Sequence, residues 1–274
     1  MPNYVYPLGH SDRELQRLIF QGEMLQAITH RMLLSANVGA GSSVLDIGCG
    51  VGGVSQLAAR LVGPRGHVTG IDQSDAAISL ATSLARRANL SNITYANSTL
   101  EQANLDQQFD AVVGRAVLLF QPDVVTFLKK AARLVKPGGY IAFHEIDDGR
   151  QFQSRPKVEI WDLTMRALLS KLQQGCPQYD IAQRMVEVFA LAGLPVPELT
   201  YEIPTAGGKA ESLCLWATET LRSLSGNATH AQLANGYAMD WDALNLELQS
   251  AIASANAQVE FLGQVCAWAR VPAR

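Results

Sequence analysis

Short runs rich in β-branched residues alternate with amphipathic segments along the first half of the chain. SVLDIG, from Ser43 to Gly48, has the pattern of a buried strand. The segment from Val54 to Gly63 gathers apolar side chains on one face and ends in a Gly-Pro pair, so it predicts a helix. Four more strand segments follow the same alternation: residues 67–72, 92–98, 109–118 and 140–146. This alternation is typical of βαβ units and predicts five parallel strands in a doubly wound sheet.

The pattern changes after Asp147. Residues 157–175 and 180–193 predict helices, whereas residues 198–203 and 259–271 alternate as strands and predict an antiparallel terminal pair. Roughly fifty residues separate these two strands, far more than a turn needs, so we expect them to be an insertion. The predicted fold class is therefore α/β, with a seven-stranded sheet and a helical cap formed by insertions.

The expected organisation follows from these patterns. Ligands of doubly wound sheets bind at the carboxyl ends of the strands, so we expect the insertions to cover that end. The predicted parts are an N-terminal helical lid (1–36), the ligand-binding core (37–148), the cap (149–175 and 204–256) and the C-terminal part of the core sheet (176–203 and 257–274).

Composition and charge exclude several classes of protein. Hydrophobic residues make up 48% and charged residues 17% of the 274 residues, which excludes a disordered chain. The net charge of −3 provides no basic field, so nucleic acid is not expected as a partner. The four cysteines lie far apart without a C-x-x-C pair, and we expect neither disulfides nor a metal site. Without a signal peptide or a membrane span, the prediction is a cytoplasmic protein that does not contact membranes.

The candidate chemistry concentrates in the glycine loop VLDIGCGVGG, between a predicted strand and a predicted helix. Gly48-x-Gly50-x-x-Gly53 satisfies the fingerprint of dinucleotide sites, with Asp72 at the distance of a ribose-binding acid. Asp46 favours a different ligand, because a carboxylate at the strand's end would repel a pyrophosphate but suits an ammonium group. A nucleoside that carries an amino acid therefore fits better than a dinucleotide. Titration of the protein with each kind of ligand would decide between these two hypotheses.

Four ordered motifs resemble the class I S-adenosylmethionine (SAM)-dependent methyltransferases: VLDIGCGVGG, GIDQS, FDAVVGRAVL and LVKPGG. The nearest resemblance is to the small-molecule branch, which includes ubiquinone- and menaquinone-type enzymes and those of specialised metabolism. The opening YPLGHSDRELQRLIFQ and the closing AWARVP are also similar to that branch. The resemblance implies a Rossmann-like fold, SAM as cofactor and S-adenosylhomocysteine (SAH) as product.

The resemblance also implies roles for individual residues. Asp46 is expected at the methionine end of the cofactor, Asp72 at both ribose hydroxyls and Arg115 at the methionine moiety. Many relatives carry an Asp in the adenine loop where this chain has Asn97-Ser98-Thr99, so the bond to the adenine amino group is open. The full set of expected cofactor-binding residues is Gln21, Asp46, Gly48, Cys49, Gly50, Gly52, Asp72, Gln73, Ser98, Thr99, Leu100 and Arg115.

Candidates for the acceptor side are fewer. His144 ends the fifth predicted strand and is a candidate general base, against the alternative of a structural histidine. Tyr4, Tyr6 and His10 are expected to form part of a lid that binds substrate, against the alternative of a loosely packed arm. The helical face that includes Trp161 and Leu172 is expected to be core rather than substrate pocket.

The main hypothesis is methyl transfer from SAM to a small, partly apolar metabolite, at carbon, oxygen or nitrogen. A second hypothesis keeps the SAM site but assigns a cyclisation without methyl transfer, because a fold does not fix a reaction. A third makes the chain a SAM-responsive binding protein. The N-terminal arm and the insertion helices would also permit a homo-oligomer.

Overall fold

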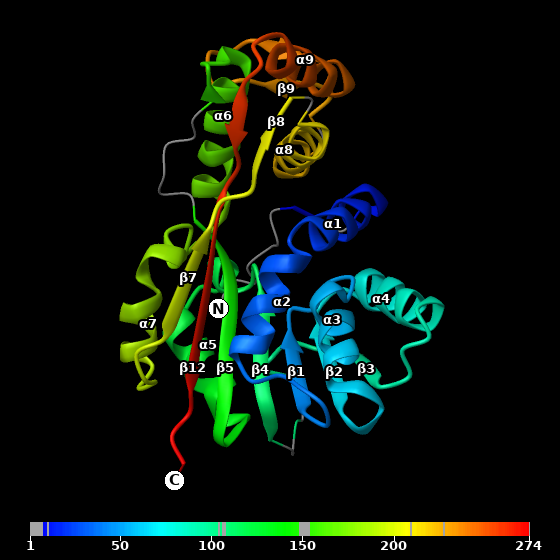
Figure 1. Ribbon diagram of the computed structural model, residues 1–274, viewed down its shortest axis with the longest axis vertical. Helices are drawn as coiled ribbons and strands as arrows, with labels where there is room; N and C mark the ends of the chain where they lie inside the picture. Colours follow the sequence, from blue (N-terminus) through cyan, green and yellow to red (C-terminus); the bar gives the residue numbers. More distant parts are fainter. Residues whose placement is uncertain are drawn as a thin grey trace.

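The computed structural model describes residues 8–9, 11–103, 105, 108–147, 154–208, 210–226 and 228–273. Their centre is a seven-stranded sheet in the order β3-β2-β1-β4-β5-β12-β7 (Figure 1). The first five of these strands run parallel, and β12 runs antiparallel to both β5 and β7. The predicted seven-stranded α/β fold is confirmed. The strands of the sheet are β1 (Ser43–Ile47), β2 (His67–Asp72), β3 (Ile93–Asn97), β4 (Phe109–Arg115), β5 (Val135–Asp147), β7 (Glu198–Glu202) and β12 (Gly263–Arg270).

Two predicted strand boundaries were wrong. The segment 259–271 is two strands, because Phe261 and Leu262 leave the ladder and the Phe261 N–H donates to the Pro204 carbonyl (2.9 Å). Both of these side chains are buried, so the apolar pattern does not reveal the break. The segment 109–118 stops at Arg115, because Ala116 adopts a positive φ of 52°. The first half of the split segment forms a small separate sheet from β6 (Ser154–Arg155), β11 (Gln258–Glu260) and β8 (Thr205–Gly207).

Helices cover both faces of the central sheet. On one face α2 packs against α3, and on the other α5 packs against α7. Right-handed crossovers place helices on both faces, because the chain crosses the sheet toward one edge from β1 to β2 and toward the other edge from β4 to β5. Side chains of Ser74 and Asp123 cap α4 and α5. These helices are α2 (Gln26–Ser35), α3 (Gly53–Val62), α4 (Asp75–Arg87), α5 (Val124–Arg133) and α7 (Met185–Leu191).

A helical cap stands beyond the carboxyl ends of the parallel strands, at the top of Figure 1. It consists of α6 (Glu159–Gly175), α8 (Glu211–Leu224) and α9 (Trp241–Ser254), which pack against one another. A short hairpin of β9 (Ala231–Gln232) and β10 (Ala238–Met239) joins α8 to α9. The N-terminal α1 (Asp12–Met24) contacts both α8 and α3, so it bridges the cap and the core. Within the described ranges, no helix combines the length and apolar character needed to cross a bilayer.

Candidate functional site

A cavity of about 580 Å³ lies at the carboxyl ends of β1, β2, β4 and β5. The strand order reverses between β1 and β4, and doubly wound sheets bind their ligands at this switch point. The loops after β1, β2 and β3, with Arg115, form one side of the cavity, and residues of α1, α6 and α8, with residues 116–122, Ile146 and Leu262, form the other. We call these the sheet side and the cap side.

The glycine loop after β1 is shaped by backbone conformation. Gly48, Gly50 and Gly52 have φ values of 66°, 52° and 83°, which residues with a Cβ rarely adopt. A Cβ on Gly48 would lie 2.5 Å from Val117 Cγ2. Helix α3 follows directly, and its N-cap Gly52 provides no side-chain cap. The first amides of α3 are therefore available to a ligand next to the cavity.

Asp72 connects the end of β2 to the glycine loop. Its carboxylate accepts the Gly50 N–H and the Ser74 N–H, each at 2.9 Å. Asp72 lines the cavity together with the predicted adenine-side residues, which are Gln73, Ser98, Thr99 and Leu100. The Ser98 N–H donates to the Asp72 carbonyl (2.9 Å), which holds the two loops together. The structure thus brings these predicted residues to one end of the cavity.

Asp46 lies beneath the glycine loop and is not part of the cavity wall. It is fully buried, with Oδ2 accepting the Ser55 hydroxyl (2.5 Å) and Oδ1 without a hydrogen-bond partner. Burial raises the pKa of this carboxyl to about 7, against the opposing effects of Ser55 and Arg115. The expectation that Asp46 projects into the crevice is therefore corrected. Its influence on a ligand is electrostatic, from below.

Arg115 ends β4 and lines the cavity. Its Nη1 donates to Thr29 Oγ1 (3.1 Å), and burial lowers the pKa of the guanidinium to about 10. The following loop is held by Glu145, whose Oε1 accepts the N–H groups of Val117 (2.9 Å) and Leu118 (2.8 Å). Glu145 is fully buried, and burial raises its pKa to about 7. Glu145 of β5 thus holds the strained turn after Arg115 in place. The sequence analysis did not predict this role.

His144 does not reach the cavity, and its assignment as a general base is corrected. The side chain is 1% exposed, with Nδ1 3.0 Å from Thr29 Oγ1 and Nε2 3.0 Å from Gln264 Oε1. Burial, with a smaller effect of Arg115, lowers the pKa of the imidazole to about 3. Both ring nitrogens are occupied by internal partners, so the ring has no free position for a substrate proton.

The other predicted cofactor residues lie in the wall with different environments. Burial raises the pKa of the Cys49 thiol well above its usual value, so Cys49 is a small neutral side chain and not a nucleophile. Gln21 lines the cavity, but its Oε1 already accepts from Arg17 Nη1 (2.6 Å) and Trp216 Nε1 (3.2 Å). Tyr4, Tyr6 and His10 lie outside the described residues.

A buried ion pair on α1 belongs to the site and was missed by the sequence analysis. Arg17 makes two hydrogen bonds of 2.7 Å to Glu14, and both side chains are at most 4% exposed. Arg17 and Trp216 also line the cavity, so α1 and α8 meet at its wall. Glu14, Arg17 and Gln21 are spaced i, i+3 and i+7, as on one helical face, and this signal was present in the sequence.

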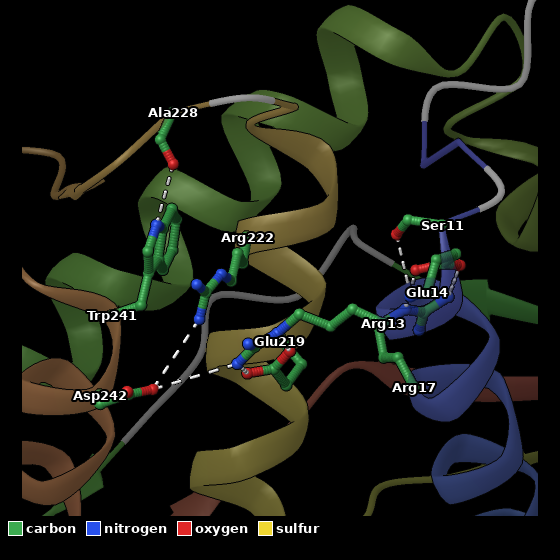
Figure 2. Close-up of polar contacts among 9 residues, drawn as sticks. All are labelled: Ser11, Arg13, Glu14, Arg17, Glu219, Arg222, Ala228, Trp241 and Asp242. Atoms are coloured by element: carbon green, nitrogen blue, oxygen red, sulfur yellow. Dashed lines mark hydrogen bonds and ion pairs between the residues drawn. The ribbon is translucent and has the colours of Figure 1, made fainter.

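A second ion pair, at the surface, joins α1 to α8. Figure 2 shows Arg13 of α1 reaching Glu219 of α8, with both guanidinium contacts at 2.6 Å. The side chain of Arg13 is 50% exposed, whereas that of Arg17 is 2% exposed. The contact between lid and cap thus has an exposed ionic edge and a buried polar centre.

The cap side of the cavity is mainly apolar. Leu172 of α6, which was expected to be core, takes part in this wall, whereas Trp161 of the same helix is core as expected. The hydroxyl of Thr220 is buried without a hydrogen-bond partner. The apolar residues of this wall are Leu119, Phe120, Ile146, Leu172, Trp216 and Leu262.

Comparison with known proteins decides the family. A family model described as a methyltransferase domain matches residues 39–211, more than half of the chain. The chain belongs to this methyltransferase family. It is a class I SAM-dependent methyltransferase of the small-molecule branch, its cofactor is SAM, and it transfers methyl groups to small molecules.

The chain is also similar to a characterised relative and to solved structures. The chain is 35% identical over 168 residues to the ubiquinone biosynthesis O-methyltransferase of Acinetobacter baumannii (strain ACICU), covering 59% of this chain and 67% of that protein. A crystal structure of a candidate methyltransferase from Bacillus halodurans C-125 matches with a TM-score of 0.58 at 15% identity, covering 89% of this chain and 98% of that one. The [4+2]-cyclase SpnF matches with a TM-score of 0.54 at 19% identity, covering 90% and 81%. At these identities the two structures show a shared fold.

The residues of the sheet side fit SAM. Glycines with positive φ keep the loop open where a Cβ would collide with Val117. Asp72 provides carboxylate oxygens suited to hydroxyl groups, and Arg115 with the uncapped start of α3 provides donors suited to a carboxylate. Above its pKa of about 7, the Asp46 carboxylate, with Oδ1 unpartnered, adds a negative field beneath them. These groups match the ribose and the amino-acid end of the cofactor.

Proposed function

We propose that this methyltransferase acts on a small metabolite with a substantial apolar part, at a carbon, oxygen or nitrogen atom, in the biosynthesis of a cofactor or a specialised metabolite. The observation that carries this proposal is the apolar cap side, which faces the glycine loop across one cavity. An apolar ring or chain would bury its surface against Phe120, Leu172 and Trp216. The similarity to a ubiquinone biosynthesis O-methyltransferase supports an acceptor of this kind.

The proposed cofactor-binding residues, apart from Gln21 of α1, come from the sheet side. Asp72 would accept the ribose hydroxyls while it keeps the Gly50 N–H, and Gly48, Cys49, Gly50 and Gly52 would bring the backbone close to the cofactor. Arg115 would bind the carboxylate of the amino-acid end, and Asp46 would favour its ammonium group from below. Gln73, Ser98, Thr99 and Leu100 would surround the adenine, with Gln21 closing the wall from α1.

SAM supplies an electrophilic methyl group on a positively charged sulfur. The protein's residues therefore need mainly to align the acceptor and exclude water. The lid–cap contact serves the second task, because Gln21 and Trp216 close the wall between α1 and α8. Among the described residues that line the cavity there is no histidine. On the described residues alone, the acceptor we favour is one whose nucleophilic atom is unprotonated or readily ionised at neutral pH, such as an aromatic amine, an acidic phenol or a stabilised carbon acid.

The N-terminal arm remains a proposed contributor. Leu8, at its end, lines the cavity. Tyr4, Tyr6 and His10 would extend this wall over the acceptor, as the sequence analysis expects.

The test is a turnover screen of the purified protein with SAM and matched acceptors: phenols, quinols, indoles and amines, each with and without an apolar substituent. We expect SAH release together with a product heavier by one methyl group, and a preference for the substituted member of each pair. Preference for the unsubstituted, polar members would contradict the proposal. Conversion of an acceptor without SAH release would favour the cyclisation hypothesis, and binding of NAD in place of SAM would refute the cofactor site.

A further inference from the structure

A chain of hydrogen bonds runs behind the cavity from Arg115 to the start of β12. Arg115 Nη1 donates to Thr29 Oγ1 (3.1 Å), which lies 3.0 Å from His144 Nδ1. His144 Nε2 lies 3.0 Å from Gln264 Oε1, and Gln264 Nε2 donates to the Leu262 carbonyl (2.9 Å). Thr29, His144 and Gln264 are each at most 1% exposed. Water therefore does not compete for these bonds.

One arrangement of protons satisfies every member of this chain. The Gln264 amide donates to a carbonyl, so its oxygen accepts the proton of His144 Nε2. The neutral ring then has a bare Nδ1, which accepts the Thr29 hydroxyl proton. This leaves the lone pairs of Thr29 Oγ1 for the Arg115 guanidinium. A doubly protonated ring would donate to Thr29 as well, and the hydroxyl proton would then have no acceptor among these residues.

We propose that Thr29, His144 and Gln264 form a positioning relay that holds the Arg115 guanidinium ready for a carboxylate, with His144 acting as a neutral hydrogen-bond link. The relay fixes Nη1 from behind, and Arg115 itself lines the cavity. None of the three relay residues belongs to the cavity wall, so they act on the ligand through Arg115.

The surroundings of Arg115 support a carboxylate as its ligand. Among the residues that the structure describes, no carboxylate oxygen lies within the 4.0 Å ion-pair distance of this guanidinium. Its Nη2 extends toward two glycines, where an added Cβ would lie 3.1 Å away on Gly53 and 3.5 Å away on Gly22. Gly53 begins α3, so the guanidinium lies next to a helix N-terminus, where partial positive charge also favours an anion. Burial and the nearby Arg115 disfavour a charged His144, as the relay requires.

This inference rests on the proposed cofactor site, because the carboxylate we assign to Arg115 is that of the cofactor's amino-acid end. An acceptor carboxylate has the same chemistry and is the competing source. The two are distinguished by the ligand pair SAH and decarboxylated SAH, S-adenosyl-3-thiopropylamine, which differ in that one group.

The test compares Thr29→Val, which removes the hydroxyl at nearly constant shape, with Thr29→Ser, which keeps it. By calorimetry we expect Thr29→Val to weaken SAH binding about 5- to 10-fold, the loss of one charge-assisted hydrogen bond and its positioning. Binding of decarboxylated SAH should change by less than about twofold, and Thr29→Ser should bind both ligands like the natural protein. Equal losses for the two ligands, or no loss, would overturn the relay. Equal affinity of the natural protein for both ligands would assign the carboxylate to the acceptor and also contradict the proposal.

A measurement on the natural protein covers the case in which Thr29→Val does not fold. Ring ¹⁵N spectra, with the His144 signals identified through His144→Asn, should show the neutral Nε2–H form without titration between pH 5 and pH 8. A charged ring or the Nδ1–H form in this range would overturn the relay. If the natural protein binds neither SAH nor its analogue, the cofactor site fails, and these spectra still decide the state of the relay.

Discussion

The two sides of the cavity are built by different means. On the sheet side the wall is largely backbone: three glycines with positive φ, and loops joined by Asp72, which bonds to residues at most 26 positions away. On the cap side the wall is made of side chains from distant segments. The hydrogen bond between Gln21 and Trp216 spans 195 positions, and Leu262 reaches the wall from the other end of the chain.

This difference indicates a division of labour. A wall of backbone amides and one carboxylate suits a constant ligand, because it leaves few side chains to vary. A wall of apolar side chains on packed helices can change shape by substitution while the sheet stays intact. We therefore assign the cofactor to the sheet side and the choice of acceptor to the cap side. Each prediction below tests one part of this comparison.

The largest effect is expected on the sheet side, from Gly48→Ala. The added methyl would force a strained backbone at φ 66° and approach Val117 Cγ2 to 2.5 Å. Strain and overpacking together should lower the free energy of unfolding by about 2–6 kcal/mol and weaken SAH binding more than about 100-fold. Gly39→Ala is the matched control, because a Cβ there meets nothing within 4 Å. Equal stability of the two variants in urea would show that the loop geometry is not required.

The next prediction compares the contributions to stability of two ion pairs of α1, the buried Arg17–Glu14 pair and the exposed Arg13–Glu219 pair. Glu14→Ala removes the carboxylate from a fully buried pair, which should cost about 3–5 kcal/mol in the free energy of unfolding. Arg13→Ala breaks the half-exposed pair with Glu219 and should cost at most about 1 kcal/mol. Chemical denaturation of both variants measures this. Similar losses would mean that burial does not distinguish the pairs.

A smaller effect concerns the buried acid beneath the glycine loop. Because burial raises the pKa of Asp46 to about 7, the folded protein keeps a proton that the unfolded chain releases above its ordinary pKa near 4. The unfolded state then binds fewer protons, so this group lowers stability as the pH rises from about 4 to 7. Between pH 5 and pH 7.5 the free energy of unfolding should therefore fall by about 1–3 kcal/mol less in Asp46→Asn than in the natural protein. Identical pH profiles in urea would refute this account of Asp46, while Glu145, unchanged in the variant, contributes equally to both.

The sequence was informative where structure depends on near neighbours. The strand alternation and the glycine spacing are local signals, and the fold they predict is the one observed. Asp72 and the residues after β3 reach the cavity as expected, because parallel strands end at the same edge.

The sequence failed where a side chain's partner is remote. His144 has the side chain and the strand-end position expected of a general base. Its role is decided instead by its hydrogen-bond partners Thr29 and Gln264, which are 115 and 120 positions away. The helical spacing of Glu14, Arg17 and Gln21 was readable, but their burial depends on where α8 packs. The strand break at Phe261 depends on the carbonyl of Pro204, which the alternation of residues 259–271 does not contain.

The most direct test of the division of labour is the affinity for SAH of a variant with a filled cap side. Leu172→Phe adds volume to the apolar wall of α6. Its counterpart on the sheet side is Asp72→Asn, which replaces the carboxylate that joins the loops by a neutral amide. We predict that Leu172→Phe binds SAH within about twofold of the natural protein, whereas Asp72→Asn binds it about 10- to 100-fold more weakly, the range for one charged hydrogen bond. A loss of SAH affinity in folded Leu172→Phe as large as that in Asp72→Asn would contradict the account, because the cap side would then hold the cofactor.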